Sequence, residues 1–286
     1  MKADDIKTIT VIGGGTMGNG IAHHFAQMGY AVNLVDTEKQ FLDRALVTIS
    51  KNMDRQVKKE VLTEEAKKAA LARIVPTTDL SIVKGSQLII EAIYEDALIK
   101  QELFKKLDAL CSAETILASN TSSLPITQIA AATKRPDRVI GMHFMNPVPM
   151  MKLVEVIRGI ATSDETFDII KELSEKTGKV PVEVQDNPGF VGNRILMPMI
   201  NEAAYVLMEG IASAEGIDTV MKLGMGHPMG PLTLADFIGL DVCLAILEVM
   251  HDGLGDPKYH PCPLLRKMVQ AGYLGRKSGQ GFYKYA

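Results

Sequence analysis

The feature that most constrains the fold is a glycine-rich turn, Gly13-Gly14-Gly15-Thr16-Met17-Gly18, which satisfies G-x-G-x-x-G. The apolar run Ile6–Ile12 predicts a strand before it, and Met17–Met28 predicts a helix after it. In such a turn the first glycine permits the sharp bend, the second lets a pyrophosphate approach the backbone, and the third allows close helix packing. The helix N-terminus attracts the phosphate charge. A bare tight turn does not need so many glycines. The pattern therefore predicts a dinucleotide site formed by Gly13, Gly15, Thr16, Met17 and Gly18.

An acidic residue ends the next predicted strand, Ala31–Asp36. A carboxylate at this place accepts hydrogen bonds from the ribose hydroxyls and repels a 2′-phosphate. Glu38 adds a second negative charge to the same turn, while Lys39 is within reach of a phosphate. We therefore expect NAD as the cofactor, with NADP less favoured.

Short β-rich runs alternate with helical patterns through the first two thirds of the chain, which is typical of an α/β protein with a Rossmann-type doubly wound, mostly parallel sheet. The further runs are Leu88–Ile93, Thr115–Ser119, Arg138–Phe144, Lys152–Ile157 and Val180–Val184.

The pattern changes after Asp186, where helical stretches replace the alternation. These are Gly192–Glu209, Ala214–Leu223, Leu232–Met250 and Pro263–Ala271. The sequence thus predicts an NAD-binding Rossmann domain over residues 1–186 and a C-terminal all-helical domain over residues 187–286, which we expect to complete the active site.

The overall composition restricts the class of partner. A net charge of −3 argues against a general binder of nucleic acid or of a membrane surface. The 3 cysteines show no C-x-x-C pair, and the histidines show no metal-binding spacing, so neither a disulfide framework nor a metal site is predicted. The N-terminal residues lead directly into a strand without a signal-peptide pattern, and we expect a cytoplasmic or matrix-type protein.

Among the 6 histidines, His143 has the position of a catalytic group. It lies at the carboxyl end of the predicted strand Arg138–Phe144, the edge where open α/β sheets bind ligands. If the following turn centres on Pro149, Glu155 faces His143 across a hairpin. The carboxylate would then fix the imidazole tautomer and leave the other nitrogen as a general base. The alternative is a core histidine with a surface glutamate.

Two further segments carry polar groups beside turns. Asn120, Ser122 and Ser123 follow the predicted strand Thr115–Ser119, and Asn193 lies in the first turn of the helix after Pro188-Gly189. Each group suits substrate binding, and each equally suits a helix cap or domain packing.

Six motifs in order resemble the L-3-hydroxyacyl-CoA dehydrogenase family over essentially the whole chain. They are the glycine loop with Asp36, SNTSSLPI, HFMNPVPMMKLVEV, DNPGFVGNR, GHPMGPLTLADFIGLD and GRKSGQGFYKY. The resemblance implies an NAD-dependent oxidoreductase that interconverts an (S)-3-hydroxyacyl-CoA and a 3-ketoacyl-CoA. We expect 3-hydroxybutyryl-CoA and acetoacetyl-CoA as this pair.

The resemblance also implies roles for single residues. His143 corresponds to the catalytic base and Glu155 to its partner, while Ser122 and Asn193 correspond to groups that hydrogen-bond near the reacting oxygen. The implied NAD contacts, besides the glycine loop and Asp36, are Glu95, Lys100, Asn120 and Asn146. The family further implies a homodimer formed through the C-terminal domain.

A basic stripe is a candidate for the CoA phosphates. Lys51, Arg55, Lys58 and Lys59 fall at i, i+4, i+7 and i+8, which places them on one helix face. Similar helices in the resembled family contact CoA, whereas a solvated helix face is the simpler interpretation.

Two other functions remain open on the sequence. The same fold and base could act on a free hydroxy acid or sugar acid, as in the related gulonate dehydrogenases. The chain could also bind a dinucleotide without catalysis, although His143, Glu155, Ser122 and Asn193 together argue for turnover.

Overall fold

The structure is a computed structural model that describes residues 1–285. It contains two compact units, Met1–Asp186 and Asn187–Ala286, joined at the Asn187-Pro188-Gly189 segment. Each unit has its own hydrophobic core.

Unit 1 is built on an eight-stranded sheet with the order β3-β2-β1-β4-β5-β6-β7-β8. Neighbouring strands are parallel except β6 and β7, which are antiparallel. The order reverses between β1 and β4, and this reversal is the switch point of a doubly wound fold. The predicted Rossmann-type sheet is therefore confirmed. The strands are β1 Thr8–Ile12, β2 Ala31–Val35, β3 Ile74–Thr77, β4 Leu88–Glu91, β5 Ile116–Ser119, β6 Val139–Phe144, β7 Leu153–Arg158 and β8 Val180–Gln185.

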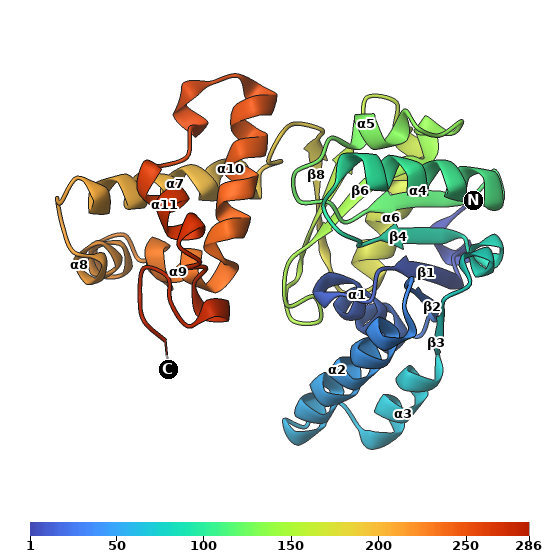
Figure 1. Ribbon diagram of the computed structural model, residues 1–286. Coiled ribbons are helices and arrows are strands. Elements are labelled where there is room, and N and C mark those ends of the chain that lie inside the picture. Colours follow the sequence, from blue (N-terminus) through green and yellow to red (C-terminus); the bar gives the residue numbers. More distant parts are fainter. Residues whose placement is uncertain (286) are drawn as a thin grey trace. The chain divides into compact units, whose positions relative to one another are not determined.

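Helices cover both faces of this sheet, and the α2 and α3 pair projects beyond the end that carries β3 (Figure 1). The glycine loop leads into α1, as predicted. The helices of unit 1 are α1 Thr16–Gln27, α2 Lys39–Lys58, α3 Glu64–Ala72, α4 Ala97–Leu110, α5 Ile126–Ala130 and α6 Asp164–Lys176. Short 3₁₀ turns lie at Ala3–Asp5, Leu80–Gly85 and Pro136–Arg138.

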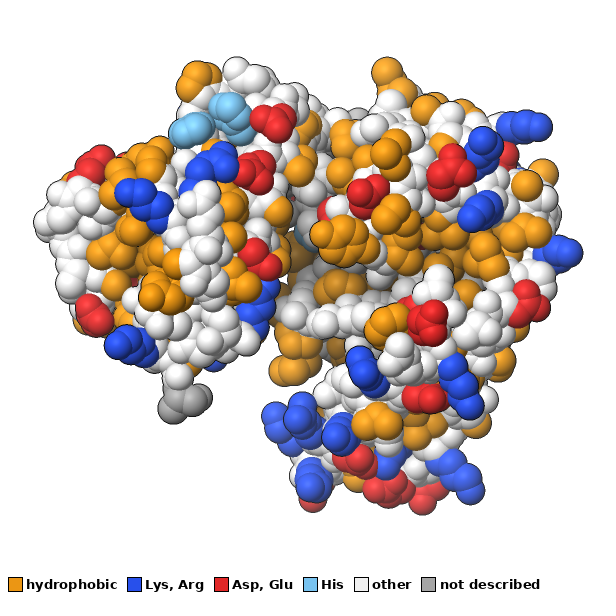
Figure 2. Space-filling model, viewed as in Figure 1, with side chains coloured by type: hydrophobic (Ala, Val, Ile, Leu, Met, Phe, Trp, Pro, Cys, Tyr) orange, Lys and Arg blue, Asp and Glu red, His pale blue; other side chains and the backbone are white. Residues whose placement is uncertain are grey.

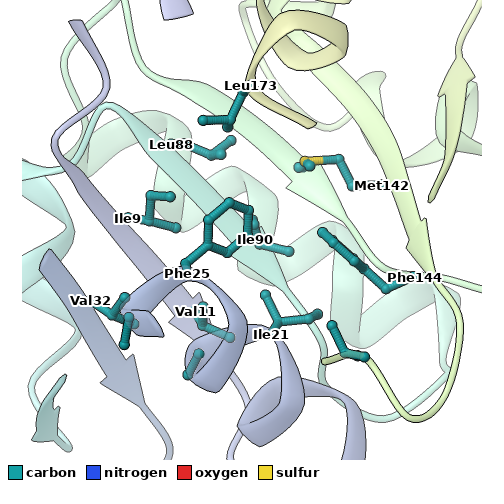
Figure 3. Close-up of a cluster of buried hydrophobic side chains, with 14 of the residues drawn as sticks. Ile9, Val11, Ile21, Phe25, Val32, Leu88, Ile90, Met142, Phe144 and Leu173 are labelled. Atoms are coloured by element: carbon teal, nitrogen blue, oxygen red, sulfur yellow. The ribbon is translucent and has the colours of Figure 1, made fainter. Parts of the chain in front are cut away.

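The core of unit 1 fills the space between α1 and the sheet. Phe25 of α1 lies among apolar side chains of several strands (Figure 3). Its ring meets that of Phe144 edge to face, with centroids 6.1 Å apart. Every residue of β6 is buried, so the strand that carries His143 is fixed on both faces.

The sequence did not predict β3. Ile74–Thr77 has only 4 residues and contains Pro76, which reads as a break in a strand. In the described part of the chain this strand lies at the sheet edge and pairs with β2 on one side, so a missing backbone N–H on the other side is tolerated.

Unit 2 is helical, as expected. Its helices are α7 Gly192–Met208, α8 Ala214–Thr219, α9 Pro231–Ile238, α10 Leu240–Leu254 and α11 Pro263–Gln270, with a π-helical turn at Val220–Gly224. The stretch Leu232–Met250, expected as one helix, belongs to two. Gly239 separates them because its φ of 108° is incompatible with a continuous right-handed helix.

Two buried aspartates hold the C-terminal segment onto the helices of unit 2. Asp218 accepts hydrogen bonds from the start of α9 and from the Tyr283 hydroxyl at 2.9 Å. Asp236 accepts from the backbone of Phe282 and Tyr283 and from the Tyr285 hydroxyl at 2.9 Å. The closing motif GRKSGQGFYKY thus has a structural role within this unit.

Two general properties concern the described part of the chain. No helix in residues 1–285 has the length and apolar character needed to cross a membrane. The thiols of Cys111, Cys243 and Cys262 are free, and the last two are buried.

Candidate active site

His143 and Glu155 form a buried pair at the carboxyl end of β6. The antiparallel register places them directly opposite each other, and His143 Nδ1 lies 2.7 Å from Glu155 Oε2. The exposed fraction of the residue is 8% for His143 and 2% for Glu155. The predicted pairing across the hairpin is confirmed. Because the carboxylate accepts the Nδ1 proton, Nε2 carries the lone pair of the neutral ring.

The glycine loop lies at the same edge of the sheet, at the switch point. Gly13 has a φ of 108°, and a Cβ there would meet Ala92 O at 2.4 Å. A Cβ on Gly18 would lie 1.7 Å from Gly13 O, so this glycine allows α1 to pack on the loop. Around Gly15, in contrast, no atom of the described residues, apart from Gly15 itself and its two chain neighbours, would lie within 4 Å of an added Cβ. This open space, in front of the first N–H groups of α1, fits a pyrophosphate.

Asp36 is tied to the glycine loop. Its Oδ2 accepts a hydrogen bond from Gly14 N at 2.6 Å, and its Oδ1 accepts one from Thr37 N at 2.7 Å. A carboxylate offers about four lone-pair sites, so these bonds leave capacity for ribose hydroxyls. The carboxylate is thus oriented by the loop that would hold the pyrophosphate.

A buried ion-pair network supports the segment after β5. The Lys100 ammonium, in a residue 1% exposed, pairs with Glu91 Oε1 and lies 3.2 Å from Glu95 Oε2. Glu91 Oε2 accepts a hydrogen bond from Ser119 Oγ at 2.6 Å. Lys100 is therefore enclosed by carboxylates, and the group of this network that reaches the surface is Glu95.

Glu95 in turn orders the segment that carries Ser122. Its Oε1 accepts hydrogen bonds from Thr121 Oγ1 at 2.6 Å and from Ser122 N at 2.9 Å. Burial opposes ionisation of Glu95, but Lys100 and these hydrogen bonds outweigh it and hold its pKa below the ordinary value. The ends of β4 and β5 are thus joined around one carboxylate.

Asn120 joins the ends of β5 and β6. Its Oδ1 accepts a hydrogen bond from Phe144 N at 2.9 Å, and its own N donates to Glu91 O at 2.8 Å. Asn146 lies two residues beyond β6, in the turn that leads to β7. The structure therefore places the candidate residues of unit 1 along one sheet edge, whereas Asn193 belongs to unit 2, in the first turn of α7.

The basic stripe is exposed. Lys51, Arg55 and Lys58 lie on α2 and Lys59 caps its end, opposite the face buried through Leu42, Ala45, Ile49 and Met53. Figure 2 shows Lys and Arg side chains gathered over the end of α2. The helical spacing predicted from the sequence is present.

Two residues of this site, Glu91 and Ser119, were not predicted from the sequence. Glu91 and Ser119 are the last residues of buried strands and are themselves fully buried. A carboxylate at the end of the apolar run Leu88–Glu91 was the available signal, because a buried charge requires a partner.

The fold and this site together are those of a dinucleotide-linked oxidoreductase. The family model described as "3-hydroxyacyl-CoA dehydrogenase, NAD binding domain" matches residues 8–187, and the one described as "3-hydroxyacyl-CoA dehydrogenase, C-terminal domain" matches residues 189–285. The chain belongs to the 3-hydroxyacyl-CoA dehydrogenase family.

Relatives with specific names are similar over almost the whole chain. A probable 3-hydroxybutyryl-CoA dehydrogenase of Bacillus subtilis is 58% identical over 281 residues, which cover 98% of both proteins. One of Deinococcus radiodurans is 60% identical over 275 residues, which cover 96% of this chain and 99% of that protein. The crystal structure of (S)-3-hydroxybutyryl-CoA dehydrogenase from Ralstonia eutropha superposes with a TM-score of 0.95 at 51% identity and covers 98% of this chain and 99% of that one.

Proposed function

We propose that the chain catalyses the NAD-linked interconversion of (S)-3-hydroxybutyryl-CoA and acetoacetyl-CoA. The family supports the reaction class, and the relatives named above support the short acyl chain. The observation that carries the proposal is the buried His143–Glu155 pair, which lies at the sheet edge that also holds the glycine loop.

His143 acts as the general base. The Glu155 carboxylate accepts a hydrogen bond from Nδ1–H, which leaves the lone pair on Nε2. Nε2 therefore takes the proton of the C3 hydroxyl during oxidation and returns it during reduction. The carboxylate stabilises the imidazolium that forms after proton uptake. The bound nicotinamide supplies the hydride chemistry.

Ser122 and Asn193 would hold the reacting oxygen by hydrogen bonds, a positioning and electrostatic role. The Glu95 carboxylate supports this role for Ser122 by fixing the backbone of its segment. Because Lys100 is enclosed by Glu91 and Glu95, its contribution to cofactor binding would be to orient Glu95.

The cofactor site would consist of the glycine loop and Asp36, together with Glu95, Asn120 and Asn146. NAD is the proposed cofactor and NADP is disfavoured, since the Asp36 carboxylate, oriented by Gly14 and Thr37, would repel a 2′-phosphate.

The stripe Lys51, Arg55, Lys58 and Lys59 would bind the CoA phosphates. Its exposure and its position on one face of α2 support this role. The acyl-CoA thioester would thus be recognised at a group remote from the reacting carbon.

Unit 2 would form a homodimer. Several of its large apolar side chains are exposed, among them Leu223 at 82%, Ile195 at 70% and Ile211 at 67%. Exposed apolar surface marks protein contacts where it forms a contiguous patch. A cytoplasmic location is also part of the proposal and agrees with the three free thiols.

The test of the base is His143→Ala, assayed at 340 nm with acetoacetyl-CoA and NADH. We expect kcat to fall by at least about 10²-fold, since general bases contribute about 10² to 10⁴. NADH binding, followed by the nucleotide's own fluorescence, should change little. His251, which contacts Asp252 at 3.2 Å on the surface of unit 2, provides the matched control as His251→Ala.

The outcomes separate the alternatives. Wild-type turnover in His143→Ala would refute its role as the base. Turnover of a free hydroxy acid without turnover of acyl-CoA would favour the gulonate-type alternative, and NADH binding without any turnover would favour a non-catalytic protein.

A further inference from the structure

The turn between β6 and β7 has a buried inner side, where its backbone carbonyl groups need hydrogen-bond donors. Residues 145–152 connect His143 to Glu155 and contain Asn146, and the turn is closed by Met150 N and Met151 N, which both donate to Pro147 O at 3.0 Å. Val148 is only 2% exposed, so the inner side of the turn is buried. Its backbone carbonyl groups need hydrogen-bond donors there.

One side of the turn packs on α1. A Cβ added to Gly20 would lie 3.0 Å from Val148 Cγ2, which shows that Val148 sits directly on the backbone of this helix. Apolar packing of this kind holds the turn against α1 but satisfies none of its carbonyl groups.

Lys179 supplies the missing donors. The residue is only 6% exposed, and its Nζ donates hydrogen bonds to Val148 O and, at 2.8 Å, to Met151 O. These two carbonyl groups come from the turn and from the residue that precedes Lys152 and β7. One ammonium group therefore binds two carbonyl groups of the segment that joins His143 to Glu155.

The backbone of Lys179 is itself firmly held. Its N donates to Ser174 O of α6 at 2.9 Å, and the next residue, Val180, donates to Lys152 O at 2.8 Å. The side chain thus extends from a fixed point, where α6 passes into β8, to the turn.

The charge of this ammonium is costly. Among the described residues, the partners of the Lys179 ammonium are the two carbonyl groups and not a carboxylate, and burial lowers its pKa to about 8. The neighbouring His24 of α1 is also buried, and burial together with the Lys179 charge lowers its pKa to about 3. A methionine would fill the same space without the desolvation cost, but it would leave the carbonyl groups of Val148 and Met151 without these donors. The ammonium therefore contributes its hydrogen bonds to the turn and not only packing.

We propose that Lys179 is a positioning residue of the active site: by binding the carbonyl groups of Val148 and Met151 it fixes the turn that carries Asn146 and joins His143 to Glu155. The inference rests on the roles proposed above for His143 and Asn146. Its effect should be seen in cofactor binding and in turnover, because both residues are attached to this turn.

The test is Lys179→Met, with Lys171→Met on the exposed face of α6 as the matched control. We expect the Kd for NADH, measured by fluorescence of the nucleotide, to rise at least about fivefold, the effect of about one lost hydrogen bond. We expect kcat with acetoacetyl-CoA to fall at least about tenfold per folded molecule, since small misplacements of reacting groups have effects up to about 10²-fold. Lys171→Met should match the wild type in both measurements.

Each outcome decides the proposal. A folded Lys179→Met with Kd and kcat within about twofold of wild type overturns it, as does a loss of thermal stability with both constants unchanged. Lys179→Gln, which keeps one donor group, should fold with a smaller loss; if neither variant folds, Lys179 is needed for the whole unit and the proposal fails. Failure of the proposed reaction itself would leave the change in NADH Kd measurable.

Discussion

At the scale of single residues, the Glu155 carboxylate is what distinguishes His143 from an ordinary buried histidine. In Glu155→Gln, an amide replaces the carboxylate that lies 2.7 Å from Nδ1, and the imidazolium loses its stabilising charge. We expect kcat to fall less than in His143→Ala. The pH profile for oxidation should differ from that of the wild type, because the imidazolium loses its stabilising charge. Superimposable profiles would contradict this role.

His24 provides a prediction about stability. Burial and then the Lys179 charge lower its folded-state pKa to about 3, while an unfolded histidine has its pKa near 6.5. The unfolded state therefore takes up the proton first, and stability falls as the pH decreases from about 6.5 toward 3. The slope for this group alone reaches about 1.4 kcal/mol per pH unit. Urea unfolding of His24→Leu should show a smaller loss between pH 7 and pH 4 than the wild type; equal losses would contradict the assignment.

The proposed preference for NAD depends on Asp36 and on the residue that follows it. Replacing Asp36 with Ser and Thr37 with Arg removes the charge that repels a 2′-phosphate and adds one that attracts it. The NADPH to NADH ratio of kcat/KM should rise at least tenfold, about 1.4 kcal/mol. A wild-type enzyme that is already faster with NADPH would contradict the role given to Asp36, and it would leave that of His143 unaffected.

At the scale of elements, α2 is expected to bind the remote part of the substrate. Lys58→Glu with Lys59→Glu should raise KM for acetoacetyl-CoA and leave kcat nearly unchanged, since these groups act equally in ground state and transition state. The double variant Lys105→Glu and Lys106→Glu makes the same charge change on exposed positions of α4. A truncated pantetheine thioester should be insensitive to the α2 variant, and equal damage with both substrates would indicate a folding defect.

The sequence predicted those elements whose signal is local. The glycine loop, α1 and the β6–β7 hairpin follow from residue spacing, and the hairpin register placed His143 opposite Glu155. In contrast, β3 was not predicted because it contains Pro76. A proline fits a strand at a sheet edge, and the edge position of β3 follows from the strand order, which the local sequence does not reveal.

Parts of the site depend on distant contacts and gave no local signal. Lys179 follows Gly178 at a helix end, where a lysine is ordinarily a solvated residue, and its partners lie 28 and 31 residues earlier in the chain. The sequence likewise does not predict that Lys100 is buried between two carboxylates. The burial and the partners of these two lysines can be recognised only in the folded structure.

At the scale of the whole molecule, the proposed dimer has a direct measurement. Light scattering after size exclusion should give twice the 31.1 kDa mass of the chain. Among Ile195→Lys, Ile211→Lys and Leu223→Lys in unit 2, at least one should shift the mass toward that of a monomer. Ile160→Lys, at a site 90% exposed in unit 1, is the control. A wild-type mass of one chain at micromolar concentration would refute the dimer.

The three thiols can report the unfolding of the two units, because each unit contains at least one of them. Burial raises the pKa of Cys111 to about 11 and that of Cys243 to about 12, so neither offers a reactive thiolate at neutral pH, and Cys262 is shielded from reagents by its burial. Cys111 lies in unit 1 and the other two lie in unit 2. Pulse alkylation followed by mass analysis of peptides would therefore time the opening of each unit separately, without any introduced label.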